Sequence, residues 1–313
     1  MKKANALSSV NYGYEFTVGV TPFPRTSKVL WTVNFNGAIN RNVVTHLPDD
    51  VRLLLKYDDD NKQDIVYRLG RSNLSYILYH YRGVFRSDDE VPVDPATGKP
   101  YRVQTDKGTY YFGAGDPYWT DLDGNYIIDA NDRVIAGSAA IKILGGIQSV
   151  LRYKDYSLSI NMSYVKGRDI LNNALAQRLQ SYSNPFALQK DASLIPINDI
   201  DFWSEDKPDS RYPNPYNYMY SGLYNPFRFD QTLFMEDGSY FKINTATLTY
   251  MLPKSLISKF RMTTFQIFAT ANNIYTFSNY SGPDPELVTD LGKDRSDGYP
   301  NRRSYTLGLN IQF

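Results

Sequence analysis

The 313-residue sequence has no cysteine, only two histidines and no excess of charge of either sign. Without cysteine, disulfides and thiolate metal sites are excluded. His46 and His80 lie far apart in the chain, so a histidine-based triad or a histidine-rich zinc site is not expected. The formal net charge of +1 creates no long-range field that would attract nucleic acid. We therefore expect no nucleic-acid partner.

Long apolar runs are also missing. No stretch of about 18 apolar residues occurs, so no transmembrane helix is predicted. The first residues, MKKANALSSV, begin with basic residues but lack an apolar core, so no signal peptide is expected there. The mean hydropathy of −0.45 is compatible with a membrane β-barrel, because only every second residue of each strand faces lipid.

What the sequence does contain is aromatic residues, at 15% with 27 tyrosines, and repeated alternation of apolar and polar residues. In the last segment Tyr305, Leu307, Leu309 and Ile311 alternate with polar residues and glycine. A period of two marks strands with one apolar and one polar face. This pattern predicts seven strands, at 12–21, 29–37, 144–154, 156–166, 239–251, 263–275 and 303–313.

The connections between these strands alternate between short and long. The long ones are about 41–143, 167–238 and 276–302. A soluble β-sandwich that binds glycans would have mostly short connections, whereas an outer-membrane barrel has short periplasmic turns and long extracellular loops. The fold class is therefore all-β, an antiparallel transmembrane β-barrel segment that ends at the periplasmic side. Further strands, for example around 76–85, would have to come as a pair, which leaves nine strands as the alternative to seven.

Several motifs then resemble one known family in order along the chain. The stretch 272–286, NNIYTFSNYSGPDPE, resembles a signature of SusC/RagA-like TonB-dependent importers, and GSYFKI at 238–243 and the segment 121–133 match the family as well. The resemblance implies the C-terminal strands of a 22-stranded barrel in a bacterial outer membrane. It also implies uptake of oligosaccharides or peptides, a SusD-like lid lipoprotein, indirect contact with TonB through a plug, and no enzymatic activity.

The sequence departs from this family in what it lacks. It shows no plug domain and no segment for contact with TonB, and seven strands cannot enclose the family's perimeter. Unpaired strand edges in lipid cost several kcal/mol for each group. We therefore expect an N-terminal barrel and plug portion, in the same or in a second chain, to complete the sheet in the membrane. The alternative function is an outer-membrane scaffold of the same fold that transports no solute.

The strongest candidate for a chemical site is an acidic loop. Counted from Asp121, side-chain oxygens fall at positions 1, 3, 5, 9 and 12, with a backbone carbonyl at 7, the spacing of a calcium loop of the EF-hand type. Tyr126 stands where such a loop has glycine, and Asp132 replaces its final glutamate. A metal-free turn rich in Asp and Asn remains the alternative. The proposed structural Ca²⁺ ligands are Asp121, Asp123, Asn125, Ile127, Asp129 and Asp132.

Two further features concern binding and assembly. A segment rich in aromatic residues could present stacking surfaces to a solute or to the lid protein, or could pack on itself as an ordered loop. Its residues are Trp203, Tyr212, Tyr216, Tyr218, Tyr220 and Tyr224. The C-terminal Phe313 ends an alternating strand and resembles the signal that the outer-membrane assembly machinery reads. No catalytic residue and no organic cofactor site are predicted.

Overall fold

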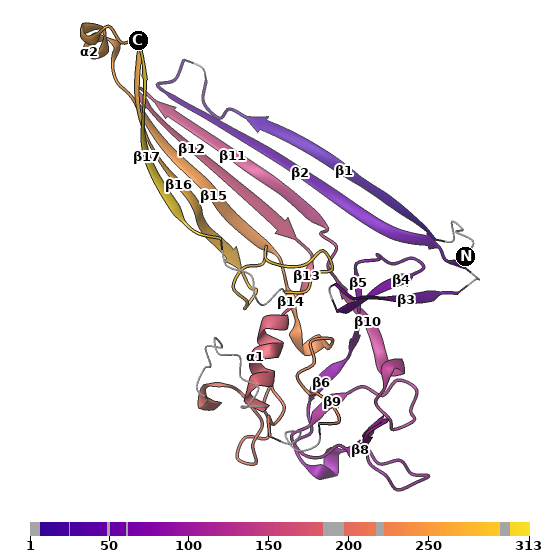
Figure 1. The fold of residues 1–313 in the computed structure, drawn as a ribbon. Coiled ribbons are helices and arrows are strands. Elements are labelled where there is room, and N and C mark those ends of the chain that lie inside the picture. The colour runs from indigo at the N-terminus through magenta and orange to yellow at the C-terminus, as the bar shows by residue number, and fades with distance from the viewer. Residues whose placement is uncertain are drawn as a thin grey trace.

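The computed structural model describes residues 7–24, 26–48, 51–60, 62–183, 197–216, 222–294 and 301–313. Its main feature is one seven-stranded antiparallel sheet with the order β1-β2-β11-β12-β15-β16-β17 (Figure 1). The strands are β1 (Ser8–Val20), β2 (Val29–His46), β11 (Ile143–Tyr153), β12 (Tyr156–Lys166), β15 (Tyr240–Met251), β16 (Thr264–Ser278) and β17 (Ser304–Gln312). The seven predicted strands are confirmed, and all of them lie in this sheet.

The alternative of nine wall strands is wrong for the part of the chain that the structure describes. The segment 76–85 forms β5 (Ser75–Tyr79) and β6 (Tyr81–Val84), which pair with β10 (Arg133–Ser138) and β9 (Pro117–Trp119) in separate small sheets. β2 is longer than expected because its second half pairs with the start of β1, where Asn42 donates to Asn11. Polar pairs of this kind satisfy each other's hydrogen bonds and need no apolar alternation.

One face of the sheet carries an apolar row that runs from β2 to β17. Residues that are register partners on successive strands form an unbroken row, which is Trp31, Leu151, Leu158, Leu248, Ala269 and Leu307. Leu248 and Leu307 are 50% and 78% exposed, so the described part of the chain leaves these two residues of the row uncovered. A contiguous exposed apolar surface of this kind marks contact with another protein or with a membrane.

The opposite face is polar. A second row of register partners lies three residues along each strand from the apolar row. It consists of Asn34, Gln148, Asn161, Thr245, Asn272 and Ser304. Asn272 accepts a hydrogen bond from Thr245 and donates one to Ser304, each at 3.1 Å. Residues separated by three positions on a strand point to opposite sides, so the sheet separates an apolar environment from a polar one.

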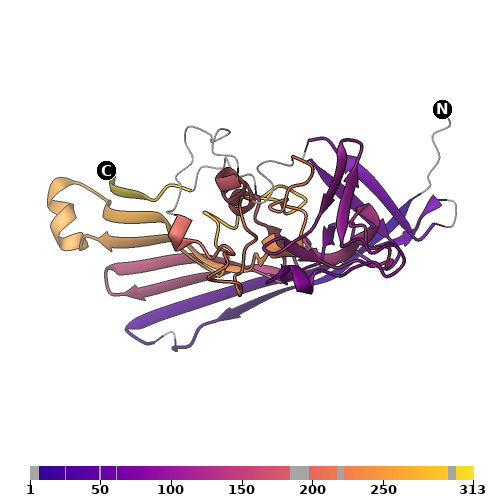
Figure 2. The same cartoon turned by 90° about the horizontal axis from the view of Figure 1, so that it is seen from below.

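The long connections gather at one end of the sheet, and the C-terminus and α2 (Lys254–Ile257) lie at the other end (Figure 1). We call the described parts of 47–142, 167–239 and 279–303 the loop assembly. Figure 2 shows the sheet as a curved layer with the loop assembly over its concave side. None of the described helices is long and apolar enough to cross a membrane.

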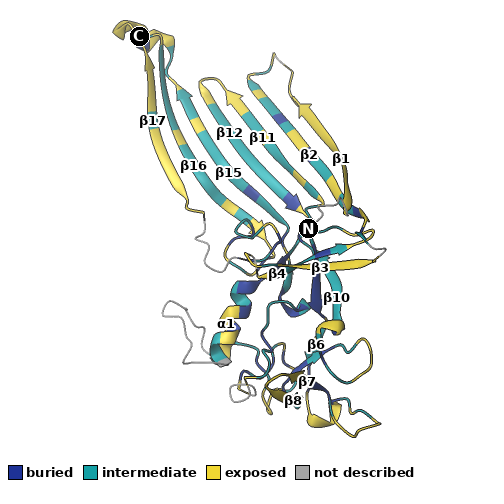
Figure 3. Ribbon diagram, turned by 45° about the vertical axis from the view of Figure 1, so that its right-hand side comes forward, coloured by how far each residue is buried: buried dark blue, intermediate teal, exposed yellow. Residues whose placement is uncertain are grey.

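The loop assembly is held together by its own cores. It contains the hairpin β3 (Leu53–Asp58) and β4 (Gln63–Arg68), the strands β7 (Arg102–Thr105), β8 (Gly108–Tyr111), β13 (Asp169–Leu171) and β14 (Met235–Asp237), and α1 (Asn173–Ser183). Phe85 and Trp119 belong to one buried cluster and Leu179 and Phe234 to another. Figure 3 shows that buried residues concentrate here, whereas the edge strands β1 and β17 are exposed.

Candidate functional site

The acidic loop folds into a series of tight turns that its own side chains close. Asp121 accepts hydrogen bonds from the backbone N–H groups of Gly124 and Tyr126, both at 2.8 Å. Tyr126 has φ of 59°, in the left-handed region. This residue therefore provides the sharp turn for which EF-hand loops use glycine, so its side chain does not prevent the turn.

Three carboxylates converge within this loop. Oxygens of Asp121, Asp123 and Asp132 lie within 4.8 Å of one another. Asp132 is fully buried and accepts hydrogen bonds from the N–H groups of Leu122 and Asp129 at 2.8 Å. Burial raises the pKa of the Asp132 carboxyl above its ordinary value, and the negative charges of Asp121 and Asp123 add to the rise. A cation would relieve both effects.

The remaining predicted ligands close neighbouring turns. The side chain of Asn125 accepts from the N–H of Ile127 at 2.6 Å, and Asp129 accepts from the N–H of Asn131 at 2.7 Å. Asp129 and Asp132 also form a reciprocal capping box around a 3₁₀ turn. The structure thus brings three of the six residues together as carboxylates, and calcium binding stays a prediction.

The predicted aromatic segment packs largely into the loop assembly. Trp203 lies against Gly115, where a Cβ atom would come within 2.6 Å of the indole ring. Tyr212 contacts Phe202 edge to face. Tyr224 donates to the buried Asp116 at 2.5 Å and packs among aromatic rings. These positions favour the internal-packing interpretation for the three residues.

The other predicted residues differ in their surroundings. Tyr216 is 52% exposed, so its ring is available to a ligand. Tyr218 and Tyr220 lie outside the described residues. Phe313 is 85% exposed, directly after β17. Its position at the end of an edge strand is compatible with recognition by an assembly factor, and that role stays a prediction.

The Asp284-Pro285-Glu286 element fastens a loop to the sheet. Glu286 pairs with the ammonium group of Lys242, a buried residue of β15, and accepts from the Tyr240 hydroxyl at 3.1 Å. The carbonyl of Pro285 accepts a hydrogen bond from Arg168. The sequence showed this element only as part of a family signature. A lysine within a strand of β-forming residues was the signal that could have indicated its partner.

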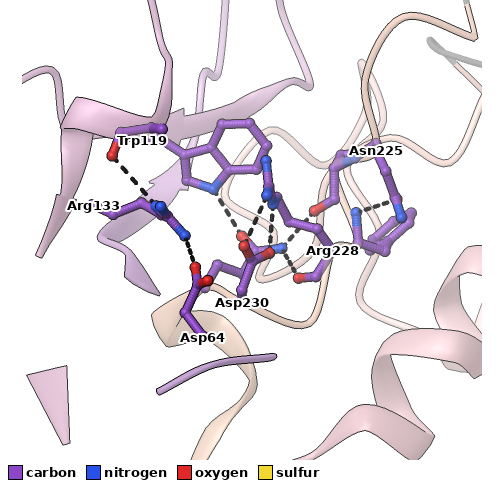
Figure 4. Close-up of polar contacts among 10 residues, drawn as sticks. Asp64, Trp119, Arg133, Asn225, Arg228 and Asp230 are labelled. Carbon is purple, nitrogen blue, oxygen red and sulfur yellow. Dashed lines mark hydrogen bonds and ion pairs between the residues drawn. The ribbon is translucent and has the colours of Figure 1, made fainter. Parts of the chain in front are cut away.

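A cavity of about 590 Å³ lies within the loop assembly. Its walls come from the β3–β4 hairpin, β5, β10, α1, the segment 225–230 and Lys293. Two ion pairs stand in the wall, Arg133 with Asp64 at 2.6 Å and Arg228 with Asp230 at 2.5 Å (Figure 4). This cavity could not be predicted from the sequence, because its lining residues lie in separate segments of the chain.

The ion pair of Arg228 with Asp230 is held by the aromatic core beneath it. The Arg228 guanidinium lies over the ring of Tyr79, 4.2 Å from its centre. Gln231, which is fully buried, accepts from the Trp119 indole N–H at 2.8 Å and donates to the Pro226 carbonyl at 2.7 Å. These contacts hold the segment that carries Arg228 and Asp230, so the polar wall of the cavity is preformed.

Comparisons with known proteins agree on one group. No protein-family model matches the chain. The chain is 27% identical to TonB-dependent receptor P3 of Formosa agariphila, over 97% of the chain and 28% of that protein. It is 23% identical to TonB-dependent receptor SusC of Bacteroides thetaiotaomicron, over 99% of the chain and 27% of that protein. The chain thus spans less than a third of the length of these curated relatives.

Solved structures show the same fold. The RagAB peptide transporter matches with a TM-score of 0.70 and 21% identity, over 99% of this chain and 30% of the other. The RagAB peptide importer in its open-open state matches with a TM-score of 0.68 and 21% identity, over 98% of this chain and 29% of the other. The likeness covers the sheet and the loop assembly together.

Proposed function

The chain has the fold and sequence pattern of the C-terminal barrel part of SusC/RagA-like TonB-dependent receptors, and we propose that it forms wall and extracellular loops of an outer-membrane nutrient importer. The observation that carries the proposal is the exposed apolar row across the sheet, from Trp31 to Leu307. Lipid would cover this face, as in outer-membrane barrels. The activity is translocation of a bound solute, without bond chemistry.

The polar face and the loops fit the rest of this role. The row from Asn34 to Ser304 would line an aqueous lumen. The loop assembly stands at one end, over the concave side of the sheet (Figure 2), where a solute entering the lumen would pass. The end with short turns carries Tyr156 and Tyr250, whose rings stack at 4.7 Å. Aromatic rings at this level suit the membrane interface.

Partners follow from the same proposal. Strands β1 and β17 are the edges of the sheet, so further barrel strands would pair with them in lipid. A plug that contacts TonB would drive transport, and a SusD-like surface lipoprotein would close the loop end as a lid. One similar solved structure is that of the RagAB peptide importer in a closed-closed state. For this chain, a lid is proposed by analogy with that importer.

Uptake in the source bacterium tests the proposal. A strain without the gene and a strain without TonB are grown on a panel of oligosaccharides and peptides, beside the parent strain. The same solutes should fail to support both mutants, and the protein should fractionate with the outer membrane. Recovery of the protein from the soluble fraction would contradict the membrane assignment. Normal growth of the gene deletion on every solute would instead favour the scaffold alternative.

We also propose that the loop carboxylates of Asp121, Asp123 and Asp132 hold a structural calcium ion. Their hard oxygens suit Ca²⁺, and burial, with a smaller contribution from the charges of Asp121 and Asp123, raises the pKa of Asp132. Limited proteolysis of the complete receptor tests this idea. Calcium should protect the loop, and Asp121→Asn should abolish the protection. Asp106→Asn, in the exposed β7–β8 turn, is the matched control. Equal cleavage with and without calcium in the parent protein would contradict it.

A further inference from the structure

The cavity in the loop assembly has the charge and the lining of a binding site. We propose that it binds a carboxylate group of the transported solute, held between Lys62 and Lys293. This inference rests on the proposed importer function and names the substrate class, a carboxylate-bearing oligomer. The volume of about 590 Å³ lies within the range of roughly 300–1,000 Å³ typical of small-molecule sites.

The first argument is the excess of positive charge. Four cationic and two anionic side chains line the cavity. The carboxylates of Asp64 and Asp230 form ion pairs with Arg133 and Arg228, and Asp230 also acts electrostatically on Lys293. By count of side chains, the lining carries two positive charges more than negative ones. An anionic group is the ligand that such a lining favours.

The second argument is the position of the lysines relative to each other. Lys62 follows the tip of the β3–β4 hairpin, and Lys293 comes from the far end of the chain. The Lys293 ammonium lies 4.0 Å from the centre of the Phe229 ring, which holds it at the cavity wall. Burial lowers the pKa of Lys293, the charge of Asp230 raises it, and the charge of Lys62 lowers it. A carboxylate between the two ammonium groups would be attracted by both.

The third argument is an unsatisfied polar atom. Gln63 lines the cavity and is only 8% exposed. Its side-chain nitrogen donates to the Leu291 carbonyl at 3.5 Å, but its buried oxygen accepts no hydrogen bond within the described part of the chain. An orphaned buried acceptor is costly. A ligand that carries hydroxyl or amide donors beside its carboxylate would satisfy it.

The neighbouring lining suits an oligomer of polar units. Helix α1 contributes the amides of Asn173, Gln177 and Gln180, and Asn225 adds another from the opposite wall. Amide groups donate and accept at once, so they match the hydroxyl groups of a sugar acid and the backbone of a peptide equally well. The shared recognition element is thus the carboxylate, and the source of that group is decided by experiment.

Calorimetry on the complete receptor tests the proposal. The probes are trigalacturonate, triglutamate and the neutral sugar maltotriose. The parent protein should bind one of the two carboxylated trimers and not maltotriose. The affinity of the variant Lys62→Gln/Lys293→Gln for that trimer should be reduced by about tenfold or more, as expected for losing two charge contacts. Lys107→Gln, on the exposed β7–β8 turn, is the control and should bind like the parent.

Each outcome decides the matter. Binding of trigalacturonate alone identifies a sugar acid, and binding of triglutamate alone identifies an acidic peptide. No binding of either trimer, equal binding of maltotriose, or unchanged binding by the double variant would overturn the proposal. Should the double variant not fold, the single exchange Lys62→Glu at an exposed position gives the same decision, with heat-modifiable gel mobility as the measure of folding.

The binding result is independent of transport. Calorimetry needs neither TonB nor a living cell, so a failure of uptake leaves the carboxylate site in place as a binding site. Conversely, TonB-dependent uptake of neutral solutes only, without carboxylate binding, would overturn this inference and leave the importer function standing.

Discussion

Lys242 shows how a single residue joins the sheet to a distant loop. Its side chain is buried on β15, and the carboxylate that neutralises it belongs to Glu286, 44 residues further along the chain. A buried ammonium group without a partner is strongly destabilising. The ion pair therefore makes the Asp284-Pro285-Glu286 loop part of the folded wall.

Removing the carboxylate should destabilise the protein more than removing both charges. Glu286→Gln leaves the Lys242 ammonium buried and should lower the free energy of unfolding by about 2–4 kcal/mol. The double variant Lys242→Met/Glu286→Gln should recover most of that loss. Urea titration of the receptor in detergent, followed by tryptophan fluorescence, measures both. A single variant as stable as the parent would show that the pair contributes nothing.

Lys293 should make ligand binding sensitive to alkaline pH. Burial lowers its pKa below the ordinary value of 10.5, Lys62 lowers it further, and Asp230 opposes the shift. As the pH rises, Lys293 therefore loses its charge before an exposed lysine does. As the pH is raised, affinity for the carboxylated trimer should begin to decrease before the pH reaches 10.5. In the variant Lys293→Arg this decrease should begin at a higher pH. An identical pH profile in the two proteins would contradict this assignment.

Among the elements, the wall strands place aromatic rings over glycines. Phe16 faces Gly37, Tyr164 faces Gly145 and Phe268 faces Gly308, each across a strand pair. At each of these glycines a Cβ atom would approach the opposing side chain within 3.0 Å. Rings that cover glycines in this way help to fix register in curved sheets. The absence of a side chain is therefore part of the packing.

A methyl group at one of these glycines should weaken the sheet. In Gly145→Ala the new Cβ would lie 2.2 Å from the Asn36 carbonyl oxygen, which is backbone and cannot rotate away. A cost of about 1–3 kcal/mol follows from such overpacking. Gly146→Ala is the control, because its nearest contact is a side-chain atom at 3.3 Å. Urea midpoints of the two variants should differ, and equal midpoints would argue against register fixing at Gly145.

For the whole molecule, the decisive feature is a sheet with two free edges and one apolar face. β1 and β17 each have a single neighbour in the sheet. In a bilayer, unpaired edge groups cost several kcal/mol each, and an exposed apolar face in water promotes association. If the chain forms part of an outer-membrane barrel, as proposed above, the sheet would need both lipid and additional strands for its stability.

The polypeptide 1–313 expressed alone should reflect this requirement. In detergent it should aggregate or run as a heterogeneous mixture on gel filtration, because its edges pair with other copies. Co-expression with the remaining strands of the receptor should give one species with heat-modifiable gel mobility. A monodisperse, folded monomer of 1–313 in detergent, without any partner, would defeat the idea of an incomplete wall.

The seven strands of the sheet could be predicted from local sequence patterns. Alternation such as Tyr305, Leu307 and Leu309 is a local pattern with a period of two, and a strand displays it whatever its neighbours are. The alternation of short and long connections between these strands then favoured an outer-membrane barrel over a soluble sandwich. The turns of the acidic loop were also readable, because Asp121 closes them through residues only a few positions away.

The arrangement of the long loops, in contrast, depends on contacts between distant segments that form only on folding. Lys62, Arg133, Arg228 and Lys293 meet at one cavity although 231 positions separate the first from the last. Likewise, Tyr224 packs against the buried aromatic cluster, where its hydroxyl donates to Asp116, 108 positions away in the chain. Such contacts are set by packing between distant segments, which leaves no periodic or local trace in the sequence.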